Sequence, residues 1–303
     1  MMATYNGEKY LHQQIDSLLN QTIQDFTIHI TDDVSTDSTW DILQEYAKRH
    51  PRNIKIYQRT KNSGGAKYNF LSMMVNTRND YLMLCDQDDV WLPNKIEISL
   101  NKVKELEQQH PNTPILVRTD MRVVNQNLQE ISPSYKQSMN SNFNRTAFNQ
   151  ILIQNTFAGC TAIYNRALAE MLFCEPVYCI MHDWWLELVA SAFGELGHVD
   201  EPTVLYRQHD SNEIGAKDVR KLSYMFNRLI HNSEVKEAIR ITYDQGESFM
   251  KIYENQMTEG QKVVLRQYCA IPQMSKISRW QTICKLGSFK NGLSRNIAYL
   301  MFV

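Results

Sequence analysis

Residues 82–91, LMLCDQDDVW, carry three carboxylates to the end of an apolar run. The run Leu82–Cys85 is typical of a buried strand, and Asp86, Asp88 and Asp89 follow it directly. Carboxylates this close repel one another, and burying them without a partner is costly. Because packing alone gives no reason to place them there, we expect a functional site at the end of this strand.

The sequence around this stretch alternates strand and helix patterns. Apolar and polar residues alternate in FTIHITDD, residues 26–33, whereas apolar residues recur every three or four positions in EKYLHQQIDSLLN, residues 8–20. The pattern predicts further strands at 1–4, 54–58, 81–86 and 115–124, and further helices at 38–50, 66–76 and 95–110. Strands that alternate with helices indicate an α/β fold with a mostly parallel sheet flanked by helices.

Acidic residues fall where two of these strands end. Asp32 and Asp33 close one strand, and the three acids of DQDD follow another. In parallel α/β sheets, ligands bind outside the carboxyl ends of the strands. We therefore expect the two acidic clusters to lie at one edge of the sheet and to form one site.

Composition restricts the class of protein. The chain has 303 residues, of which 43% are hydrophobic and 21% charged, and its formal net charge is -1. These values are typical of a folded protein with one large domain, or with one domain and a smaller appendage. They exclude a disordered chain and argue against nucleic acid as a partner.

The six cysteines form no CxxC pair, and several lie in apolar runs. We therefore expect reduced, buried thiols and a cytoplasmic protein. Residues 1–10 contain no apolar stretch of signal-peptide length, and no window reaches the roughly 18–20 apolar residues of a transmembrane helix. A peripheral position at the inner face of the plasma membrane stays open.

The DQDD turn suits a divalent cation. Hard cations such as Mg²⁺ bind carboxylate oxygens and keep waters and substrate phosphates as further ligands. A bound cation would also offset the repulsion among the acids. The alternative is a solvated acidic turn that caps the helix at 95–110. The apolar strand before the turn and Trp91-Leu92-Pro93 after it favour the metal site.

Three other motifs carry candidate residues, each with a structural alternative. In TDDVSTD, residues 31–37, a carboxylate can accept the imide N–H of a pyrimidine, whereas Asp37 can cap the next helix. In HDWW, residues 182–185, Asp183 suits a general base but can equally cap the helix that follows. In YRQH, residues 206–209, His209 can ligate a metal or can be an ordinary surface-loop histidine, and Arg207 can contact phosphate.

In their order along the chain, these segments resemble the family 2 glycosyltransferases, which have the GT-A fold of nucleotide-diphospho-sugar transferases. The matching segments lie between residue 1 and about residue 215: ATYNGEKYL, ITDDVSTDST, NSGGAKYNF, CDQDDVWLPNK, NTFAGCTAIYNRAL, MHDWWL and YRQHDSNEIGA. The combination of CDQDDVW, HDWW and YRQH looks most like the rhamnosyltransferases of bacterial rhamnan and O-antigen synthesis.

The resemblance implies a role for each matching residue. The residues that would bind the donor nucleotide, with Asp33 reading the pyrimidine, are Thr4, Tyr5, Asn6, Glu8, Asp33, Lys67, Asn69, Asp86 and Gln87. A divalent metal, Mg²⁺ or Mn²⁺, would be held by Asp88, Asp86 and His209. Asp183 matches the catalytic base. The donor sugar and the acceptor would lie near Asp89, Gly159, Cys160, His182 and Trp184.

By the same resemblance the protein is an inverting, metal-dependent glycosyltransferase. The expected reaction moves L-rhamnose from dTDP-rhamnose onto a glycan or lipid-linked glycan in cell-surface polysaccharide synthesis. One alternative is a glucosyl-, galactosyl- or GlcNAc-transferase of the same family that uses a UDP-sugar. Another, from a different class, is a non-catalytic protein that binds a nucleotide-sugar or a glycan.

The expected catalytic domain covers residues 1–217, with a donor half at about 1–120 and an acceptor half at about 121–217. Residues 218–303 are expected to form a mainly helical extension. From Gly260 to Val303 this extension has seven basic residues and no acidic one. We expect it either to make peripheral contact with an anionic membrane surface or to pack on the catalytic domain.

Overall fold

The computed structural model describes residues 1–209 and 232–303, which fold into two compact units. The first unit contains residues 1–135, 158–175 and 197–209. The second contains residues 136–157, 176–196 and 232–303. The domain boundary expected at residues 217 and 218 lies outside the described residues.

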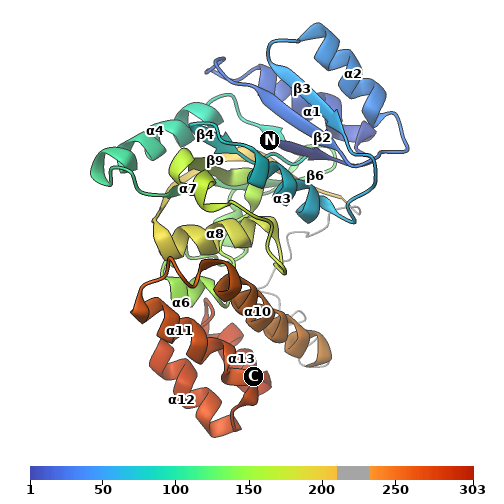
Figure 1. Cartoon of the computed structure of the whole chain (residues 1–303). Helices are drawn as coiled ribbons and strands as arrows, with labels where there is room; N and C mark the ends of the chain where they lie inside the picture. Colours follow the sequence, from blue (N-terminus) through green and yellow to red (C-terminus); the bar gives the residue numbers. More distant parts are fainter. Residues whose placement is uncertain (210–231) are drawn as a thin grey trace. The chain divides into compact units, whose positions relative to one another are not determined.

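A parallel three-stranded sheet opens the first unit (Figure 1). Its strands lie in the order β1 (Met2–Thr4), β2 (Ile28–Asp32) and β3 (Ile54–Gln58), and the connections contain α1 (Glu8–Leu19) and α2 (Thr39–Arg49). In β2 the side chains alternate, so that Ile28, Ile30 and Asp32 share the buried face. The two-residue period that buries the isoleucines therefore also buries Asp32 at the end of the strand.

A second sheet has the order β4-β8-β6-β9-β5, with β7 paired to β6. Its strands are β4 (Tyr81–Met83), β5 (Val90–Trp91), β6 (Ile115–Asn125), β7 (Glu130–Ser132), β8 (Ala162–Asn165) and β9 (Glu195–Gln208). The pairs β4–β8, β6–β8, β6–β7 and β5–β9 run antiparallel.

The predicted α/β class is confirmed, but the sheet is less parallel than the sequence pattern indicates. Parallel pairing joins β1, β2 and β3, and an isolated parallel bridge joins Met2 to Cys85. The Cys85 N–H donates to the Met1 carbonyl at 2.9 Å, so the chain after β4 passes beside β1. The antiparallel strands β8 and β9 come from residues 125–215, which lack a regular pattern in the sequence.

The helices of the first unit agree closely with the sequence pattern. α1, α2, α3 (Ala66–Asn76) and α4 (Lys95–Gln109) begin and end within one residue of the predicted helices. Their apolar faces pack on the sheets, with Leu11 and Ile15 of α1 and Val103 of α4 fully buried. A short helix, α7 (Arg166–Met171), and a 3₁₀ turn, η1 (Gly159–Thr161), flank β8.

The second unit is helical, as expected for the C-terminal part of the chain (Figure 1). Its helices are α6 (Phe148–Ile151), α8 (His182–Phe193), α10 (Asn232–Tyr253), α11 (Glu259–Cys269), α12 (Lys276–Leu286) and α13 (Leu293–Phe302). Phe249 lies at the centre of an aromatic core, with ring centroids 4.7 Å from Tyr253 and 5.6 Å from Trp185. Thr258 and Gln261 form a reciprocal capping box that starts α11.

Every helix within residues 1–209 and 232–303 is too short or too polar to cross a bilayer. The six cysteines are free thiols, as expected. Cys85, Cys160 and Cys179 are buried, whereas Cys284 is exposed on α12.

We predict that Phe249→Ala destabilises the second unit by about 3–5 kcal/mol, because it leaves a cavity among packed rings. Urea unfolding followed by circular dichroism measures the change in the free energy of unfolding. Val263→Ala, at an exposed position of α11, is the matched control and should stay within about 0.5 kcal/mol of the wild type. Equal losses in the two variants would contradict the aromatic core described here.

Candidate functional site

The loop after β1 and the acidic loop after β4 are joined by one amide side chain. The Tyr5 N–H donates to Gln87 Oε1 at 2.9 Å, and Gln87 Nε2 donates back to the Tyr5 carbonyl at 2.9 Å. A Cβ atom at Gly7 would lie 2.4 Å from Gln87 Oε1, so a larger residue there would displace this amide. Gln87, predicted to bind the donor, therefore positions the loop at residues 4–7, and it leaves the Tyr5 ring exposed.

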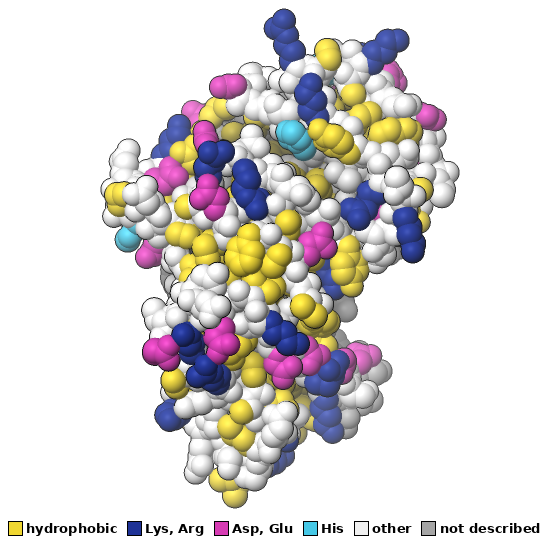
Figure 2. Space-filling view, viewed as in Figure 1, with side chains coloured by type: hydrophobic (Ala, Val, Ile, Leu, Met, Phe, Trp, Pro, Cys, Tyr) yellow, Lys and Arg dark blue, Asp and Glu magenta, His cyan; other side chains and the backbone are white. Residues whose placement is uncertain are grey.

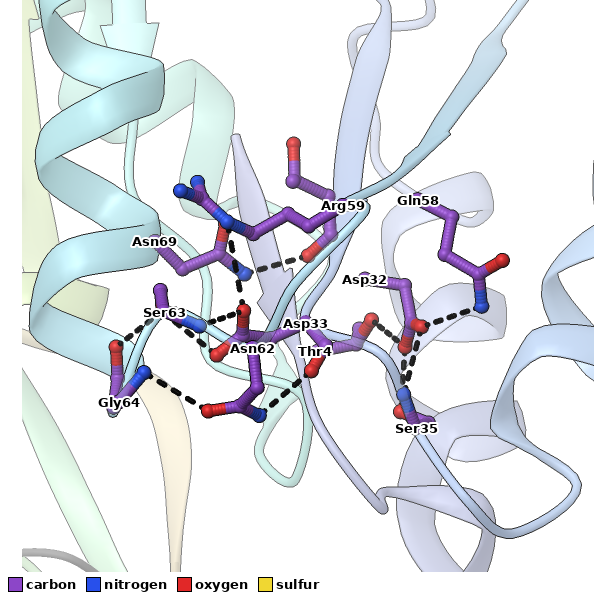
Figure 3. Close-up of polar contacts among 12 residues, drawn as sticks. Thr4, Asp32, Asp33, Ser35, Gln58, Arg59, Asn62, Ser63, Gly64 and Asn69 are labelled. Atoms are coloured by element: carbon purple, nitrogen blue, oxygen red, sulfur yellow. Dashed lines mark hydrogen bonds and ion pairs between the residues drawn. The ribbon is translucent and has the colours of Figure 1, made fainter.

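Asp32 is a structural acid. Its carboxylate accepts hydrogen bonds from Thr4 Oγ1 at 3.1 Å, from the Ser35 N–H and hydroxyl, and from Gln58 Nε2 (Figure 3). Buried carboxylates are tolerated when several donors surround them. Thr4, predicted to lie near the nucleotide, uses its hydroxyl to hold Asp32 at the end of β2.

The neighbouring Asp33 orders a different loop (Figure 3). Its N–H donates to the Thr4 carbonyl at 2.8 Å, and its carboxylate accepts from the Ser63 N–H and the Ser63 hydroxyl, both at 2.7 Å. Arg59 Nε lies 3.6 Å from the same carboxylate. Asp33, predicted to read the pyrimidine, thus connects the end of β2 to the loop that leads into α3.

Asn6 and Glu8 tie the loop after β1 to the loop after β2. The Thr36 N–H donates to Asn6 Oδ1 at 2.8 Å, and Asn6 has a positive φ of 46°, which asparagine tolerates better than most residues. The Ser38 N–H donates to the Glu8 carboxylate at 2.9 Å, while the Glu8 N–H donates to the Asp37 carboxylate at 3.2 Å. Asp37 therefore caps the first residue of α1, and Glu8 holds the residue that precedes α2.

Two predicted donor residues lie at the start of α3. The buried Asn69 donates through Nδ2 to the Thr31 carbonyl at 2.8 Å, while its Oδ1 has no hydrogen-bond partner among the described residues. Lys67 is partly exposed, and its ammonium lies 4.7 Å from the centroid of the Tyr68 ring. Lys67 is thus the more accessible of the two.

Asp89 is fully buried in the acidic loop. Its Oδ1 accepts the Arg207 N–H at 3.0 Å, and the Cys160 thiol also hydrogen-bonds to the carboxylate. Burial, together with the negative charges of Asp88 and Asp86, raises the pKa of Asp89 well above its usual value. Asp89 therefore differs from Asp86 and Asp88 in being fully buried and in binding its proton more tightly than an ordinary carboxylate.

Asp86, Asp89 and Cys160 offer ligand atoms that all lie within 4.8 Å of one another. Carboxylate oxygens suit a hard divalent cation. Burial raises the pKa of the Cys160 thiol well above its usual value, so this sulfur stays protonated and serves as a hydrogen-bond donor. The structure thus brings two carboxylates together at a point where a cation could bind.

Asp88 and His209 meet, although 120 residues separate them in the chain. His209 Nε2 lies 2.8 Å from Asp88 Oδ2, and both side chains are mostly shielded from solvent. The His209 ring packs on Tyr10, with centroids 4.8 Å apart. The structure therefore brings together two of the three residues predicted to hold the metal, and Asp86 lies in the same loop as Asp88.

The buried side chain of Arg207 stabilises the acidic loop. Its guanidinium donates to the Asp88 carbonyl at 2.7 Å, to the Gln126 carbonyl at 2.6 Å and to Gln13 Oε1 at 2.6 Å. It also stacks on the Tyr10 ring at 4.5 Å. The expectation that Arg207 contacts phosphate is wrong, because the side chain is buried and its donors serve the protein. No signal in YRQH distinguishes such an arginine from a phosphate ligand.

Lys95 is a second buried cation that the sequence pattern does not single out. Its ammonium lies 4.6 Å from the centroid of the Trp91 ring and has no hydrogen-bond partner among the described residues. Burial lowers the pKa of Lys95 to about 8, even though nearby acidic groups oppose the change. The cation–π contact explains why Trp91 follows the acidic loop: its ring faces the first residue of α4.

The HDWW motif lies in the second unit, at the start of α8. Met181 occupies the N-cap position, so Asp183 is not the N-cap residue that the structural alternative requires. Asp183 accepts the Trp184 N–H at 2.6 Å, and Trp184 Nε1 donates to the Ile151 carbonyl at 2.7 Å. Burial lowers the pKa of His182 to about 3, so its imidazole is neutral at physiological pH.

The acidic loop and the loops after β1 and β2 form one connected set within the first unit. Gly159 and Cys160 of η1 are buried, and Cys160 contacts this set through Asp89. The set offers carboxylates for a cation and an exposed tyrosine beside an ordered loop. This arrangement suits binding of a diphosphate ligand through a cation.

The comparison with protein families matches residues 1–173 to the model of glycosyl transferase family 2. The dTDP-rhamnosyl transferase RfbG of Shigella flexneri is 28% identical over 252 residues, which cover 78% of this chain and 82% of that protein. The chondroitin synthase of Escherichia coli is 38% identical over 104 residues, which cover 34% of this chain and 15% of the synthase.

Solved structures share the fold at low sequence identity. Residues 1–349 of Staphylococcus aureus TarS, in complex with UDP, align with a TM-score of 0.55 and 19% identity over 91% of this chain and 72% of that one. The mannosyltransferase PcManGT of Pyrobaculum calidifontis, in complex with GDP-Man and Mn²⁺, aligns with a TM-score of 0.52 and 16% identity over 94% of this chain and 83% of that one.

We predict that Arg207→Lys destabilises the first unit by about 2–4 kcal/mol. Lysine keeps the charge but cannot reach three separate acceptors, so buried carbonyls lose their donors. Denaturant unfolding measures this loss. Arg122→Lys, at a half-exposed position of β6, is the control and should change stability by less than about 0.5 kcal/mol. An Arg207→Lys variant as stable as this control would refute the role assigned to Arg207.

Lys95 should make stability depend on pH. The folded-state pKa of about 8 lies below the usual value near 10.4, so the unfolded chain binds more protons between these two values. The free energy of unfolding should therefore gain a contribution that rises from pH 8 to about pH 10, and Lys95→Met should lack it. Urea unfolding at several pH values tests this, with Lys102→Met as control. A Lys95→Met variant that keeps the wild-type slope would show that burial does not lower the pKa of Lys95.

Proposed function

The chain belongs to glycosyl transferase family 2, and from that premise we propose that it transfers L-rhamnose from dTDP-rhamnose onto a glycan or lipid-linked glycan. As a member of the family, the protein is an enzyme that takes a sugar from a nucleotide-sugar donor. The rhamnosyl specificity is supported by one observation. The similarity to a dTDP-rhamnosyl transferase extends over 78% of this chain, and so beyond the part that the family model matches.

The proposed donor site lies in the first unit. We propose that the exposed ring of Tyr5 and the carboxylate of Asp33 bind the base of the donor nucleotide. Gln87 holds the Tyr5 backbone, and Ser63 holds the Asp33 carboxylate, so both are ordered before a ligand arrives. Asp33 Oδ1 meets both the Ser63 N–H and Arg59, whereas Oδ2 accepts the Ser63 hydroxyl and keeps a lone pair that can accept an imide N–H. Lys67, partly exposed at the start of α3, would lie on the nucleotide side of this site.

The acidic loop fits a divalent cation such as Mg²⁺ or Mn²⁺. Ligand atoms of Asp86 and Asp89 lie within 4.8 Å of each other, and Asp88 of the same loop lies against His209. We propose Asp88 and Asp86 as the direct ligands, with His209 as a further ligand. A cation bound there would stabilise negative charge on the departing diphosphate. The protein contributes a fixed loop, because Arg207 and Gln87 hold the backbone on either side of Asp88.

Asp183 is the proposed general base of an inverting single displacement. Its carboxylate takes the proton from the acceptor hydroxyl as the hydroxyl oxygen bonds to the anomeric carbon of the donor. The bond from that carbon to the diphosphate breaks in the same step, and the nucleoside diphosphate leaves with its electron pair. From a β-L-rhamnosyl donor, inversion gives an α-L-rhamnoside. The Trp184 N–H fixes the Asp183 carboxylate, and the neutral His182 next to it adds no competing charge.

We predict that Asp183→Asn lowers the rate of sugar transfer by about 10²–10⁴, because the amide cannot accept the proton. The amide oxygen can still accept the Trp184 N–H, so folding should be preserved. Transfer to an acceptor and binding of dTDP are measured in parallel, and dTDP binding should not change. Asp200→Asn, at an exposed position, is the control. Near-normal transfer by Asp183→Asn would remove this residue from the mechanism.

A screen of dTDP-rhamnose, UDP-glucose, UDP-galactose and UDP-GlcNAc tests the donor. Donor hydrolysis that requires a divalent metal is expected for dTDP-rhamnose, and it separates an enzyme from a protein that only binds. Hydrolysis of a UDP-sugar alone would replace the rhamnosyl assignment and leave the family assignment intact.

Two variants distinguish the proposed metal ligands. Asp88→Asn should weaken Mn²⁺ binding in the presence of dTDP by at least about tenfold, because a charged oxygen ligand is lost. Asp89→Asn should weaken it less, since burial and two hydrogen bonds already engage the Asp89 carboxylate. Calorimetric titration with Mn²⁺ measures both. The reverse order would favour the Asp86–Asp89 pair as the ligands.

A further inference from the structure

Two helices of the second unit expose apolar side chains at helical spacing. The six exposed residues are Ile277, Trp280 and Cys284 on α12, and Leu293, Ile297 and Met301 on α13. Residues three, four or seven positions apart lie on one face of a helix, so each set forms a stripe. Ile277 is 68% exposed and Leu293 is 78% exposed, so most of each side chain is in contact with solvent. We call these six residues the α12–α13 surface.

The two stripes adjoin. Trp280 Nε1 donates to the Leu300 carbonyl at 2.8 Å, and Lys276 Nζ donates to the Met301 carbonyl at 3.3 Å. These bonds place the first turns of α12 against the last turn of α13. The first part of the α12 stripe therefore lies beside the last part of the α13 stripe.

The fold does not need this surface for its own core. The opposite faces of the same helices supply the buried residues, with Ile283 of α12 and Tyr299 of α13 almost fully shielded from solvent. Tyr299 also hydrogen-bonds to Tyr243 of α10. Each helix is thus apolar on two sides, and one of these sides packs inside the second unit while the other is exposed.

Charge is distributed in a way that favours an anionic partner. At about 100° per residue, Lys276 and Lys285 flank the stripe of α12 on either side. Residues 260–303 hold seven basic residues and no acidic one, whereas residues 1–259 hold 25 basic and all 33 acidic residues. On the face drawn in Figure 2, the part that Figure 1 assigns to α12 shows yellow and dark blue side chains and no magenta ones.

We propose that the α12–α13 surface binds the headgroup region of a bilayer that contains anionic lipid. Apolar side chains would enter the boundary between headgroups and acyl chains, while the flanking lysines meet lipid phosphates. A second copy of the chain fits less well, since a symmetric contact would bring two basic surfaces together. The proposal concerns this surface alone and holds whichever sugar the enzyme transfers.

Co-sedimentation of the full chain with vesicles tests the proposal without donor or acceptor. Vesicles of phosphatidylcholine with phosphatidylglycerol should bind the protein, and vesicles of phosphatidylcholine alone should bind it at least about tenfold less. Binding should weaken as NaCl rises from 0.1 M to about 0.5 M, because salt screens charges near the surface. An environment-sensitive fluorophore on Cys284, the one exposed cysteine, should shift to shorter wavelength on binding.

Variants separate the apolar and the electrostatic contributions. Ile277→Ser combined with Ile297→Ser should weaken vesicle binding at least about tenfold, and Lys285→Ala should weaken it about fivefold. Val263→Ser, at an exposed apolar position of α11, is the matched control and should bind as the wild type does. All variants should keep the circular dichroism spectrum and the donor hydrolysis of the wild type.

Three results would overturn the proposal. Vesicle binding that is absent, or that the double serine variant leaves unchanged, would mean that this surface is not a membrane site. Equal binding to vesicles with and without phosphatidylglycerol would lead to the same conclusion. A dimer in analytical ultracentrifugation that the double serine variant dissociates would instead assign the surface to a second copy of the chain.

Discussion

The buried guanidinium of Arg207 is the contact on which the acidic loop depends. One residue at the end of β9 holds three parts of the chain at once, because its donors reach Asp88, Gln126 and Gln13, and its N–H reaches Asp89. Without these bonds, a loop with three carboxylates in four residues would expand into solvent. The positive charge and the fixed directions of the N–H groups together make a compact acidic loop compatible with a folded core.

Each acid of the site is compensated by a different kind of partner, and these partners separate structural from chemical roles. Asp32 is surrounded by hydroxyl, amide and backbone donors. Asp89 is buried, and its carboxylate accepts hydrogen bonds from the Arg207 N–H and the Cys160 thiol. Asp88 instead meets the imidazole of His209, whose Nε2 lies 2.8 Å from Asp88 Oδ2. Asp32 and Asp89 thus stabilise the loops of the site, whereas Asp88 lies against a second side chain that can ligate a metal and is the better placed to bind a cation.

The sequence predicts the elements of the first unit well because they are local. Helices such as α1 and α4 follow from apolar spacing, and Asp86 and Asp88 are found because they directly follow an apolar strand. What it misses depends on contacts between distant segments. The antiparallel pairing of β8 and β9, the burial of Arg207 and the position of Lys95 over Trp91 leave no periodic trace in the residues themselves. Arg207 and an arginine that binds phosphate look alike until the acceptors around it are known.

The charge distribution of the chain also argues that its two units have different tasks. A cluster of carboxylates at the end of β4 requires nearby cations, which the first unit supplies internally through Arg207 and Lys95. The last 44 residues have seven basic side chains and no acidic one. Lys262 and Arg266 pair with Glu259 and Glu254, which precede this segment, whereas the basic residues of α12 and α13 have no acid within it. An enzyme whose acceptor is carried on a lipid would need its sugar-transfer site held near a membrane. An apolar surface with tryptophan and isoleucine, flanked by lysines, is physically sufficient to bind the enzyme to such a membrane.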